Sequence, residues 1–372
     1  IGFRRMKVNK SIYIGAMSGT SHDAIDVSFI SVDGSINLEF FYSYKLPKSL
    51  RVKIANQISS NNTTLSDLGK LNKELGLAFL KAIATGITKS KINTSKIKCI
   101  AISGQTVRHE IQGNTSFSMQ LGDPNIIAAR TGIPVAYDFR NMHIAFGGQG
   151  APLVPEFHEK IFYKKNKPRI ILNIGGIANY TYLSKKSQPW GTDSGPGNAL
   201  MDAYCASKLG VSFDKNGARA SKGKVINKEL KKLLSNKFFT LSSPKSTGKE
   251  LFNFQFISKE LLKHTDEDVL ATLSEFTAKS ISDAISKNKH SDSQIIVCGG
   301  GSKNTNLINR IRAHHKNELL LSEELGFDSQ AIESMAFAWL GFKRVNKKAS
   351  SIQLGAKKYT KGLLGSVARS KP

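Results

Sequence analysis

Residues 169–183 read R-I-I-L-N-I-G-G-I-A-N-Y-T-Y-L, with runs of β-branched and aromatic residues on either side of Gly175-Gly176. Such a pattern predicts two strands joined by a tight turn. The start of the chain carries a related pattern, with strands expected at residues 12–17, 24–32 and 38–44 and a turn near Gly19. We expect an antiparallel meander there, echoed by the second unit at residue 169.

The remainder of the chain alternates helices with strands, which predicts an α/β fold. Apolar residues recur on one face of a helix expected at 65–88, and a buried strand follows at 97–103. Further helices are expected at 268–286, 304–314 and 330–345, with a strand at 294–298. At 372 residues the chain exceeds the size of a single hydrophobic core. We therefore expect one domain from residues 1–140 and 346–372, and a second from residues 141–345.

The charge is strongly basic, with 54 Lys and Arg against 28 Asp and Glu and a formal net charge of +26. This balance suggests nucleic acid as a partner. The lysines, however, occur as scattered pairs without interleaved aromatic residues or a recognisable nucleic-acid module. We expect no specific nucleic-acid binding, and a positive field that attracts small anionic substrates.

The composition also limits where the protein acts. No apolar stretch approaches the roughly 18 residues that span a bilayer, and the N-terminus lacks the pattern of a secretory signal. Three widely spaced cysteines in apolar contexts favour reduced thiols. These features predict a cytoplasmic protein without a membrane partner.

Several glycine turns follow apolar strands, an arrangement that exposes backbone N–H groups to phosphate oxygens. Residues 243–250 fail as a P-loop because Ser243 stands at the first glycine position and Glu250 follows the lysine. Gly299-Gly300-Gly301 has the wrong spacing for a dinucleotide fingerprint. The turns at Gly19 and at Gly175-Gly176 remain. Asp23 and Asp26 could position Mg²⁺ there through water, or could merely end the turn.

Residues 188–200, Q-P-W-G-T-D-S-G-P-G-N-A-L, place Asp193 in what reads as a glycine-rich turn before a helix that starts at Asn198. A carboxylate in such a turn suits proton abstraction beside a phosphate. Alternatively, Asp193 caps the helix or its turn. The residues around it leave both interpretations open.

Nine ordered motifs cover nearly the whole chain. They are I-G-A-M-S-G-T-S (14–21), G-Q-T-V-R-H (104–109), Q-L-G-D-P (120–124), G-G-Q-G-A-P-L-V-P (147–155), N-I-G-G-I-A-N (173–179), G-T-D-S-G-P-G-N (191–198), D-K-N-G-A (214–218), P-K-S-T-G-K-E (244–250) and C-G-G-G (298–301). With them the chain resembles the anhydro-N-acetylmuramic acid kinases of bacterial cell-wall recycling, within the sugar kinase, Hsp70 and actin ATPase superfamily.

The resemblance implies a two-domain, actin-like (ribonuclease H-like) ATPase fold with ATP and Mg²⁺ in an interdomain cleft. The nucleotide contacts that it implies are Gly19, Thr20, Ser21, His22, Asp23, Ala24, Ile25, Asp26, Gly175, Gly176, Gly299, Gly300 and Gly301. The expected substrate contacts are Gln105, Thr106, Arg130 and Asn198, with Arg108 and Arg140 as alternatives to Arg130. A homodimer is one assembly that the sequence leaves open.

The family's catalytic base falls at Asp193. The resemblance implies that water activated by this residue opens the 1,6-anhydro bridge at C1, and that the released O6 takes the γ-phosphoryl group of ATP. The products are N-acetylmuramate 6-phosphate and ADP. One carboxylate suffices because phosphorus, rather than a proton from a second carboxyl group, caps the leaving oxygen.

Four positions depart from the family's usual residues. His22 replaces Leu and Ala24 replaces Gly in the first loop, Ser103 stands where His commonly precedes G-Q-T, and His143 stands where Asp commonly follows D-F-R. If position 24 requires a positive φ, the Cβ of Ala24 would strain the phosphate loop. Two other functions therefore stay open: a plain hexosamine kinase acting on a free 6-hydroxyl, and a nucleotide-binding module that has lost catalysis.

Overall fold

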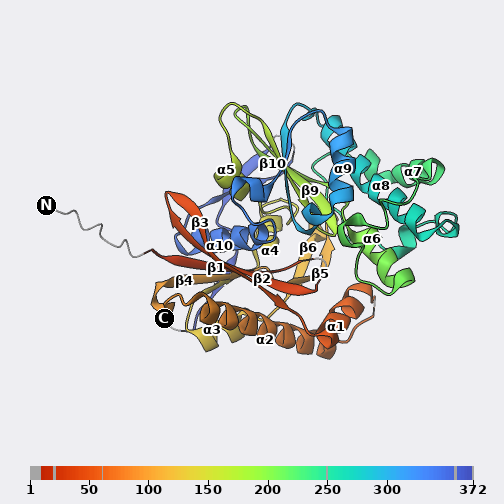
Figure 1. Cartoon of the computed structure of the whole chain (residues 1–372). Coiled ribbons are helices and arrows are strands. Elements are labelled where there is room, and N and C mark those ends of the chain that lie inside the picture. The colour runs from red at the N-terminus through yellow and green to blue at the C-terminus, as the bar shows by residue number, and fades with distance from the viewer. Residues whose placement is uncertain (1–9, 20–21, 61, 249, 356–357, 371–372) are drawn as a thin grey trace. The chain divides into compact units, whose positions relative to one another are not determined.

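The computed structural model describes residues 10–19, 22–60, 62–248, 250–355 and 358–370 (Figure 1). The chain divides into two compact units. Unit 1 comprises Ile1–Gly150, Glu333–Ile352 and Thr360–Pro372, and unit 2 comprises Ala151–Ile332 and Gln353–Tyr359. Each unit contains its own mixed sheet and its own helices, which confirms the predicted α/β class.

The sheet of unit 1 has six strands in the order β15-β7-β4-β1-β2-β3. β1, β2 and β3 form the predicted antiparallel meander, and β4 and β7 continue from β1 in parallel. A separate hairpin joins β5 and β6. The strands are β1 (Ile12–Ser18), β2 (Ala24–Asp33), β3 (Ser35–Lys45), β4 (Ile97–Ile102), β5 (Gln105–Glu110), β6 (Phe117–Leu121), β7 (Val135–Tyr137) and β15 (Ser366–Ala368).

The five-stranded sheet of unit 2 has the order β10-β9-β8-β11-β12, again with three antiparallel strands followed by two parallel ones. Five strands of unit 1, β3-β2-β1-β4-β7, therefore have the same order and directions as the five strands of unit 2, and the protein has the two-unit, actin-like α/β fold that was expected. The strands are β8 (Arg169–Ile174), β9 (Ile177–Ser184), β10 (Ser187–Pro196), β11 (Gln294–Cys298) and β12 (Leu319–Leu321). β13 (Ser350–Gln353) and β14 (Tyr359–Gly362) pair with each other.

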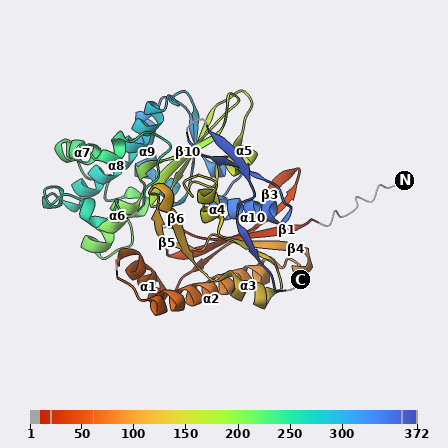
Figure 2. The ribbon, with the colours of Figure 1, turned by 180° about the vertical axis from the view of Figure 1, so that it is seen from behind.

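The helices of unit 1 cover both faces of its sheet. They are α1 (Lys48–Ser59), α2 (Leu65–Ser90), α3 (Pro124–Thr131), α4 (Phe139–Ala145) and α10 (Ala331–Val345). The hydroxyl of Thr64 caps α2, which runs along one face of the sheet (Figures 1 and 2). Gly86 of α2 lies directly against the ring of Phe29 in β2. Side chains alternate along a strand, so the neighbour Ser28 faces the other way and meets Ser334 of α10.

The helix α10 was expected in the second domain, but from Glu333 onward it packs within unit 1. Gly15 of β1 makes this possible, since a side chain there would meet the backbone oxygen of Ser334. The spacing of apolar residues predicts which face of a helix is buried, but it does not predict which sheet that face packs against. The first boundary between the units follows Gly150, whereas it was expected at residue 140. Near the end of the chain, Gln353–Tyr359 belongs to unit 2, whereas residues 346–372 were expected in the first domain.

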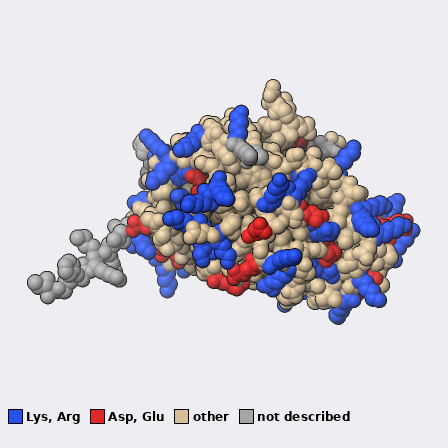
Figure 3. Space-filling model, turned by 90° about the horizontal axis from the view of Figure 1, so that it is seen from above, with Lys and Arg blue, Asp and Glu red and all other residues tan. Residues whose placement is uncertain are grey.

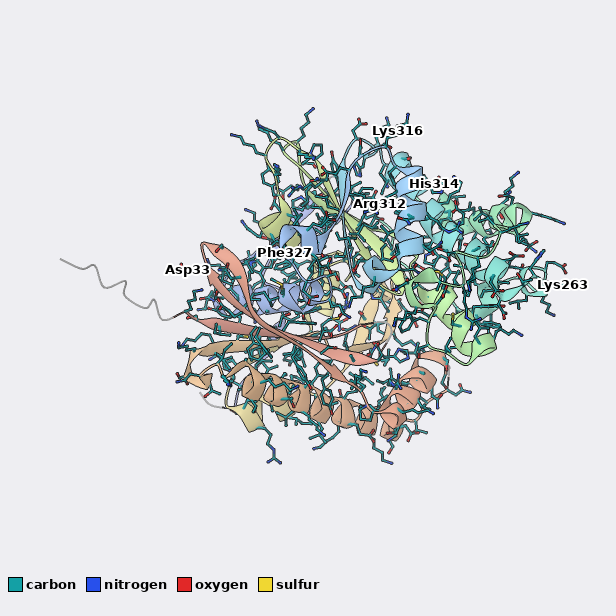
Figure 4. The ribbon with its side chains drawn as sticks, in the orientation of Figure 1. Asp33, Lys263, Arg312, His314, Lys316 and Phe327 are labelled. Carbon is teal, nitrogen blue, oxygen red and sulfur yellow. The ribbon has the colours of Figure 1, made fainter. Side chains whose placement is uncertain are left out.

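In unit 2 the core lies between the sheet and α8, whose inward side chains include Val269, Leu273 and Phe276. Phe327, labelled in Figure 4, packs edge-on against Phe162 of α5 at 5.1 Å between ring centroids. This contact joins the segment after β12 to α5. The helices are α5 (Pro155–Phe162), α6 (Ala199–Tyr204), α7 (Asn227–Leu234), α8 (Asp266–Lys287) and α9 (Thr305–His314).

The three cysteines are buried and form no disulfide. Cys99 and Cys298 lie in β4 and β11, as predicted, and burial raises the pKa of the Cys99 and Cys205 thiols to about 12. Neither of those two is therefore a reactive thiolate at neutral pH. On the face shown in Figure 3, Lys and Arg form separate groups with Asp and Glu between them. Within the described chain no helix is long and apolar enough to span a membrane.

Candidate functional site

Asp193 lies in β10, not in the glycine turn that the sequence suggested. β10 runs through the glycines and has a bulge between Asp193 and Gly195. The glycines allow close packing: Gly191 lies against Pro152 and Pro155, and Gly195, at φ +146, lies against Phe239. Asp193 is only 6% exposed. The glycine-rich composition thus reflects a crowded strand.

The predicted helix after this stretch is α6, and Asn198 is its N-terminal cap position, without a side-chain hydrogen bond. The Asp193 side chain is engaged elsewhere. Its Oδ2 accepts a hydrogen bond of 2.8 Å from the backbone N–H of Thr247. This hydrogen bond joins Asp193 to the segment around Thr247, while Asn198 occupies the cap position of α6.

Residues 245–247 hold Asp193 through a set of short hydrogen bonds. The N–H of Asp193 donates to the carbonyl of Lys245 at 2.9 Å. The hydroxyl of Thr192 accepts from the N–H of Lys245 at 3.0 Å, and it lies 3.3 Å from the Lys245 carbonyl. The hydroxyl of Thr192, the residue before Asp193, thus contacts both the N–H and the carbonyl of Lys245. We call this arrangement the Asp193 clasp (Thr192, Asp193, Lys245 and Thr247).

Sequence reasoning quoted the motif of residues 244–250 only for the resemblance and for the rejected P-loop. It missed that this segment contacts Asp193, which is 54 positions away in the chain. The only available signal was that both motifs belong to the same family pattern. Pairing across such a distance is a property of the fold and cannot be derived from local spacing.

The side chain of Lys245 is buried beside the clasp, with an exposed fraction of 8%. Its ammonium group donates a 2.8 Å hydrogen bond to the carbonyl of Phe238 and lies 4.1 Å from the centroid of that ring. Burial, with a smaller contribution from the nearby Lys287, lowers the pKa of Lys245 to about 8, and the charge of Asp193 opposes both effects.

The other glycine turns of unit 2 meet at the carboxyl ends of the parallel strands β8 and β11. The N–H of Asn198 donates to the carbonyl of Gly175, and the N–H groups of Gly197 and Ala199 donate to the carbonyl of Gly176. Gly299, at φ +81, lies against Asn173 and Ile174. The predicted residues Gly175, Gly176 and Asn198 are thus brought together.

The third glycine turn is fixed against the same strand end. A side chain at Gly301 would overlap Ile174, whereas one at Gly300 would meet no atom within 4 Å. Gly299 and Gly301 are thus required by packing, and Gly300 borders open space. Ligands of α/β sheets commonly bind outside the carboxyl ends of parallel strands, where this turn lies.

In unit 1 the predicted phosphate turn connects β1 with β2. Thr20 and Ser21 lie outside the described residues. The N–H of His22 donates to the carbonyl of Gly19 at 3.1 Å, and His22 has a positive φ of 43°. Histidine tolerates this conformation better than most residues. Ala24 begins β2, pairs with Lys45, and is absent from the positive-φ residues, so the feared strain at this position does not occur.

The remaining residues of this turn differ in exposure. Asp23 is exposed, and its carbonyl accepts from the N–H of Leu46. Ile25 is fully buried in the core, and Asp26 is half-buried opposite Met17 in the ladder. Among the described residues no group of three His, Cys, Asp or Glu side chains could hold a metal ion.

Two of the expected substrate residues, Gln105 and Thr106, begin β5, and Gln105 contacts the last residue of β1. The hydroxyl of Ser18 donates to Oε1 of Gln105 at 2.6 Å, and the side chain of Gln120 contacts the hydroxyl of Thr106 at 3.3 Å. The departure at Ser103 has a clear local role. Its hydroxyl accepts from the N–H of Ser18 and donates to the carbonyl of Gly104. Ser103 therefore ties the end of β1 to the turn that carries Gln105.

The three candidate arginines lie apart. Arg130 is exposed in the last turn of α3, and no hydrogen bond within the described ranges links it to Gln105 or Thr106. Arg108 donates to the carbonyls of Ile58, in the last turn of α1, and of Ser60, which follows that helix. Arg140 donates to the carbonyl of Gly150 at 2.9 Å. Arg108 and Arg140 thus hold backbone segments of unit 1.

His143, the fourth departure, organises the loop at residues 147–150. It is buried, and its Nδ1 accepts the N–H of Gly150 at 3.0 Å. A side chain at Gly148 would overlap the imidazole ring. Burial, with a contribution from Arg140, lowers the pKa of His143 to about 4. The neutral ring therefore accepts this hydrogen bond at neutral pH, as the more usual Asp also would.

Sequence comparison gives one consistent result. The family profile described as anhydro-N-acetylmuramic acid kinase matches residues 11–370. A protein of that name from Gamma-proteobacterium EBAC31A08 is 57% identical over 364 residues, covering 98% of this chain and all of the relative. Another, from Pasteurella multocida strain Pm70, is 41% identical over 350 residues and covers 92% of both chains.

Solved structures are more distant. An activator of 2-hydroxyisocaproyl-CoA dehydratase from Clostridium difficile, with bound ADPNP, has a TM-score of 0.46 at 13% identity and covers 92% of this chain and 99% of its own. A glucokinase of the ROK family from Streptomyces griseus, with glucose and AMPPNP, has a TM-score of 0.41 at 13% identity, covering 90% of this chain and all of its own.

Proposed function

Because the chain belongs to the anhydro-N-acetylmuramic acid kinase family, we propose that it opens the 1,6-anhydro ring of that sugar and phosphorylates O6 at the expense of ATP. The observation that supports this most directly is the Asp193 clasp. A buried carboxylate accepts a hydrogen bond from a backbone N–H there. Such a group can hold one orientation while it accepts a proton.

In the proposed reaction, Asp193 accepts a proton from a water molecule whose oxygen bonds to C1 of the sugar. The bond from C1 to O6 breaks, and O6 attacks the γ-phosphorus of ATP. The bond between that phosphorus and the β,γ-bridging oxygen breaks, and ADP leaves. The water oxygen remains as the C1 hydroxyl of N-acetylmuramate 6-phosphate, and the proton passes from Asp193 to solvent. No second carboxyl group is required, since phosphorus takes the leaving oxygen.

We propose that the glycine turns serve the nucleotide, with backbone N–H groups as the phosphate donors. In unit 1 this role falls to the turn from Gly19 to Asp26, where His22 already adopts a left-handed conformation. In unit 2 it falls to Gly175-Gly176 and to the turn around Gly300, which borders open space. Gln105, Thr106 and Asn198 are proposed for the sugar, and Arg130 stays a proposal without a supporting contact.

Mg²⁺ is proposed to enter with ATP, neutralising the phosphate charge during transfer. This ion usually keeps several waters and takes one or two carboxylates besides substrate phosphates. The exposed carboxylate of Asp23, at the first turn, fits that requirement, and the absence of a larger acidic group among the described residues is compatible with it. A cytoplasmic location and a homodimer also remain proposals, as does the lack of a specific nucleic-acid partner.

The reaction is tested with the anhydro-sugar, MgATP and water labelled with oxygen-18. We expect one labelled oxygen at C1 of the phosphorylated product and none in the phosphate, detected by mass spectrometry. Asp193→Asn should retain ATP binding and lose turnover by a factor of roughly 10³ or more, as removal of a positioned base does. A phosphorylated product without label at C1 would instead identify the plain hexosamine kinase.

A further inference from the structure

We propose that a row of side chains on the hairpin β5–β6 orients the hydroxyl of Thr106 as a hydrogen-bond donor to an oxygen atom of the sugar. The positioning residues in this row are His109, Ser118 and Gln120. The inference rests on the proposed function, in which Thr106 contacts the substrate. Its support is a set of hydrogen bonds between the side chains themselves.

A bulge in β5 brings the row onto one face of the hairpin. Thr106 lies opposite Gln120, and the register shifts between Thr106 and Arg108. His109 lies opposite Ser118. Side chains alternate along a regular strand, so residues three apart, such as Thr106 and His109, would face opposite sides. The extra residue at the bulge turns both to the side where Ser118 and Gln120 lie, and bulges next to active sites commonly re-aim a side chain in this way.

The hydrogen bonds in this row have defined donors and acceptors. The side-chain nitrogen of Gln120 donates to the hydroxyl of Ser118 at 2.6 Å and to that of Thr106 at 3.3 Å. The hydroxyl hydrogen of Ser118 is thereby left for Nδ1 of His109, 2.9 Å away. Burial, with a smaller contribution from Arg140, lowers the pKa of His109 to about 4, so the neutral ring can accept this hydrogen bond at neutral pH.

The row determines which way the hydroxyl of Thr106 acts. Its oxygen accepts from Gln120, and within the described residues its hydrogen has no acceptor. Ser118, in the middle of the row, is only 1% exposed, whereas Thr106 is half-buried and can be reached by a ligand. Apolar cross-strand pairs would also stabilise a hairpin, without the cost of burying a serine hydroxyl. What the polar row adds is a donor of fixed direction.

The test measures kcat and KM for the anhydro-sugar and for ATP. Thr106→Val removes the proposed donor and keeps the side-chain shape, and Ser118→Ala interrupts the row behind it. In both variants we expect the KM for the sugar to rise about three- to tenfold, as loss of one hydrogen bond produces, with a smaller change in kcat and an unchanged KM for ATP. Because the serine acts through Thr106, the double variant should be no worse than Thr106→Val alone. Single-variant KM factors that multiply in the double variant overturn the proposal.

A matched serine separates this role from a general loss of stability. Ser31 on β2 is also 1% exposed, and its hydroxyl donates a 2.6 Å hydrogen bond across the sheet to Glu39 of β3. Ser31→Ala should lower the thermal unfolding midpoint and leave both KM values unchanged. If it raises the KM for the sugar as much as Ser118→Ala does, the effect is one of stability alone and the proposal is wrong.

The far end of the row offers a rescue that keeps Thr106 and Ser118 in place, in case their variants do not fold. His109→Leu removes the acceptor for Ser118 and should raise the KM for the sugar. His109→Asn should restore it, because the amide oxygen can take the place of Nδ1. A wild-type KM in His109→Leu contradicts the proposal. If the wild-type protein forms no product labelled with oxygen-18, the proposed function fails together with this inference; if labelled product forms and the KM factors multiply, only the role of the row fails.

Discussion

At the scale of single residues, the buried ring of His143 fixes the conformation of the loop at residues 147–150. Its Nδ1 accepts the N–H of Gly150 while Arg140 donates to the carbonyl of the same glycine. Gly150, at φ +73, is therefore held from both sides of its peptide backbone. The sequence showed that His replaces the usual Asp here, and the structure shows that the acceptor is preserved.

We predict that His143→Leu lowers the free energy of unfolding by about 1–3 kcal/mol, because the buried N–H of Gly150 loses its acceptor. His143→Asn should recover most of that loss, since its amide oxygen can occupy the place of Nδ1. Urea unfolding at pH 7.5, followed by circular dichroism, measures both variants. Equal stability of the Leu and Asn variants would show that the hydrogen bond is unimportant.

Asp193 marks how far residue-level prediction reached. The glycines around this carboxylate singled it out in the sequence. The turn predicted around it was wrong, because glycines permit both turns and closely packed strands. The partner Thr247 is far away in sequence, and its contact is made through backbone atoms that any residue carries. Residue type could therefore indicate the acid and could not indicate what holds it.

At the scale of secondary-structure elements, α10 and β1 pack through Gly15. The Cβ of an alanine at this position would lie 1.9 Å from the backbone oxygen of Ser334 and 2.4 Å from the backbone nitrogen of Ala338. Neither atom can move without shifting the helix. The alternation of apolar residues correctly predicted the antiparallel meander and the helix, whereas the face that joins them depends on the absence of a side chain.

We therefore predict that Gly15→Ala destabilises the protein by about 1–3 kcal/mol or more, as overpacking does. Gly69→Ala on α2 is the control, because a Cβ there meets nothing within 4 Å and φ is not positive. That variant should be neutral or more stable by up to about 1 kcal/mol. The thermal unfolding midpoint of Gly15→Ala should fall below that of the wild type, and that of Gly69→Ala should stay the same or rise. A Gly15→Ala midpoint equal to that of the wild type contradicts the packing argument.

At the scale of the whole molecule, two buried and two half-buried histidines contribute to the response to acid. Burial lowers the pKa of His109, His143 and His290 to about 4 and that of His158 to about 3, and Arg140 adds to the effect on His109 and His143. In the unfolded chain each pKa returns to about 6.5. As pH falls below that value the unfolded state binds more protons than the folded state, so the free energy of unfolding decreases.

The expected slope approaches about 1.4 kcal/mol per pH unit for each such histidine between its two pKa values. Urea midpoints measured from pH 7.5 to pH 4.5 should be steady above pH 6.5 and then fall. His143→Asn should reduce the slope by about one proton. A midpoint that stays constant down to pH 5 contradicts this account.

The chain path has a consequence for synthesis on the ribosome. The sheet of unit 2 is complete once β12 has emerged, because all its strands lie between residues 169 and 321. Unit 1 begins earlier and finishes later, since α10 and β15 come from the end of the chain. At about 5–20 residues per second, roughly 15–60 s separate the synthesis of Gly15 from that of the helix that covers it. During that interval the face of β1 that later receives α10 lacks its helical cover.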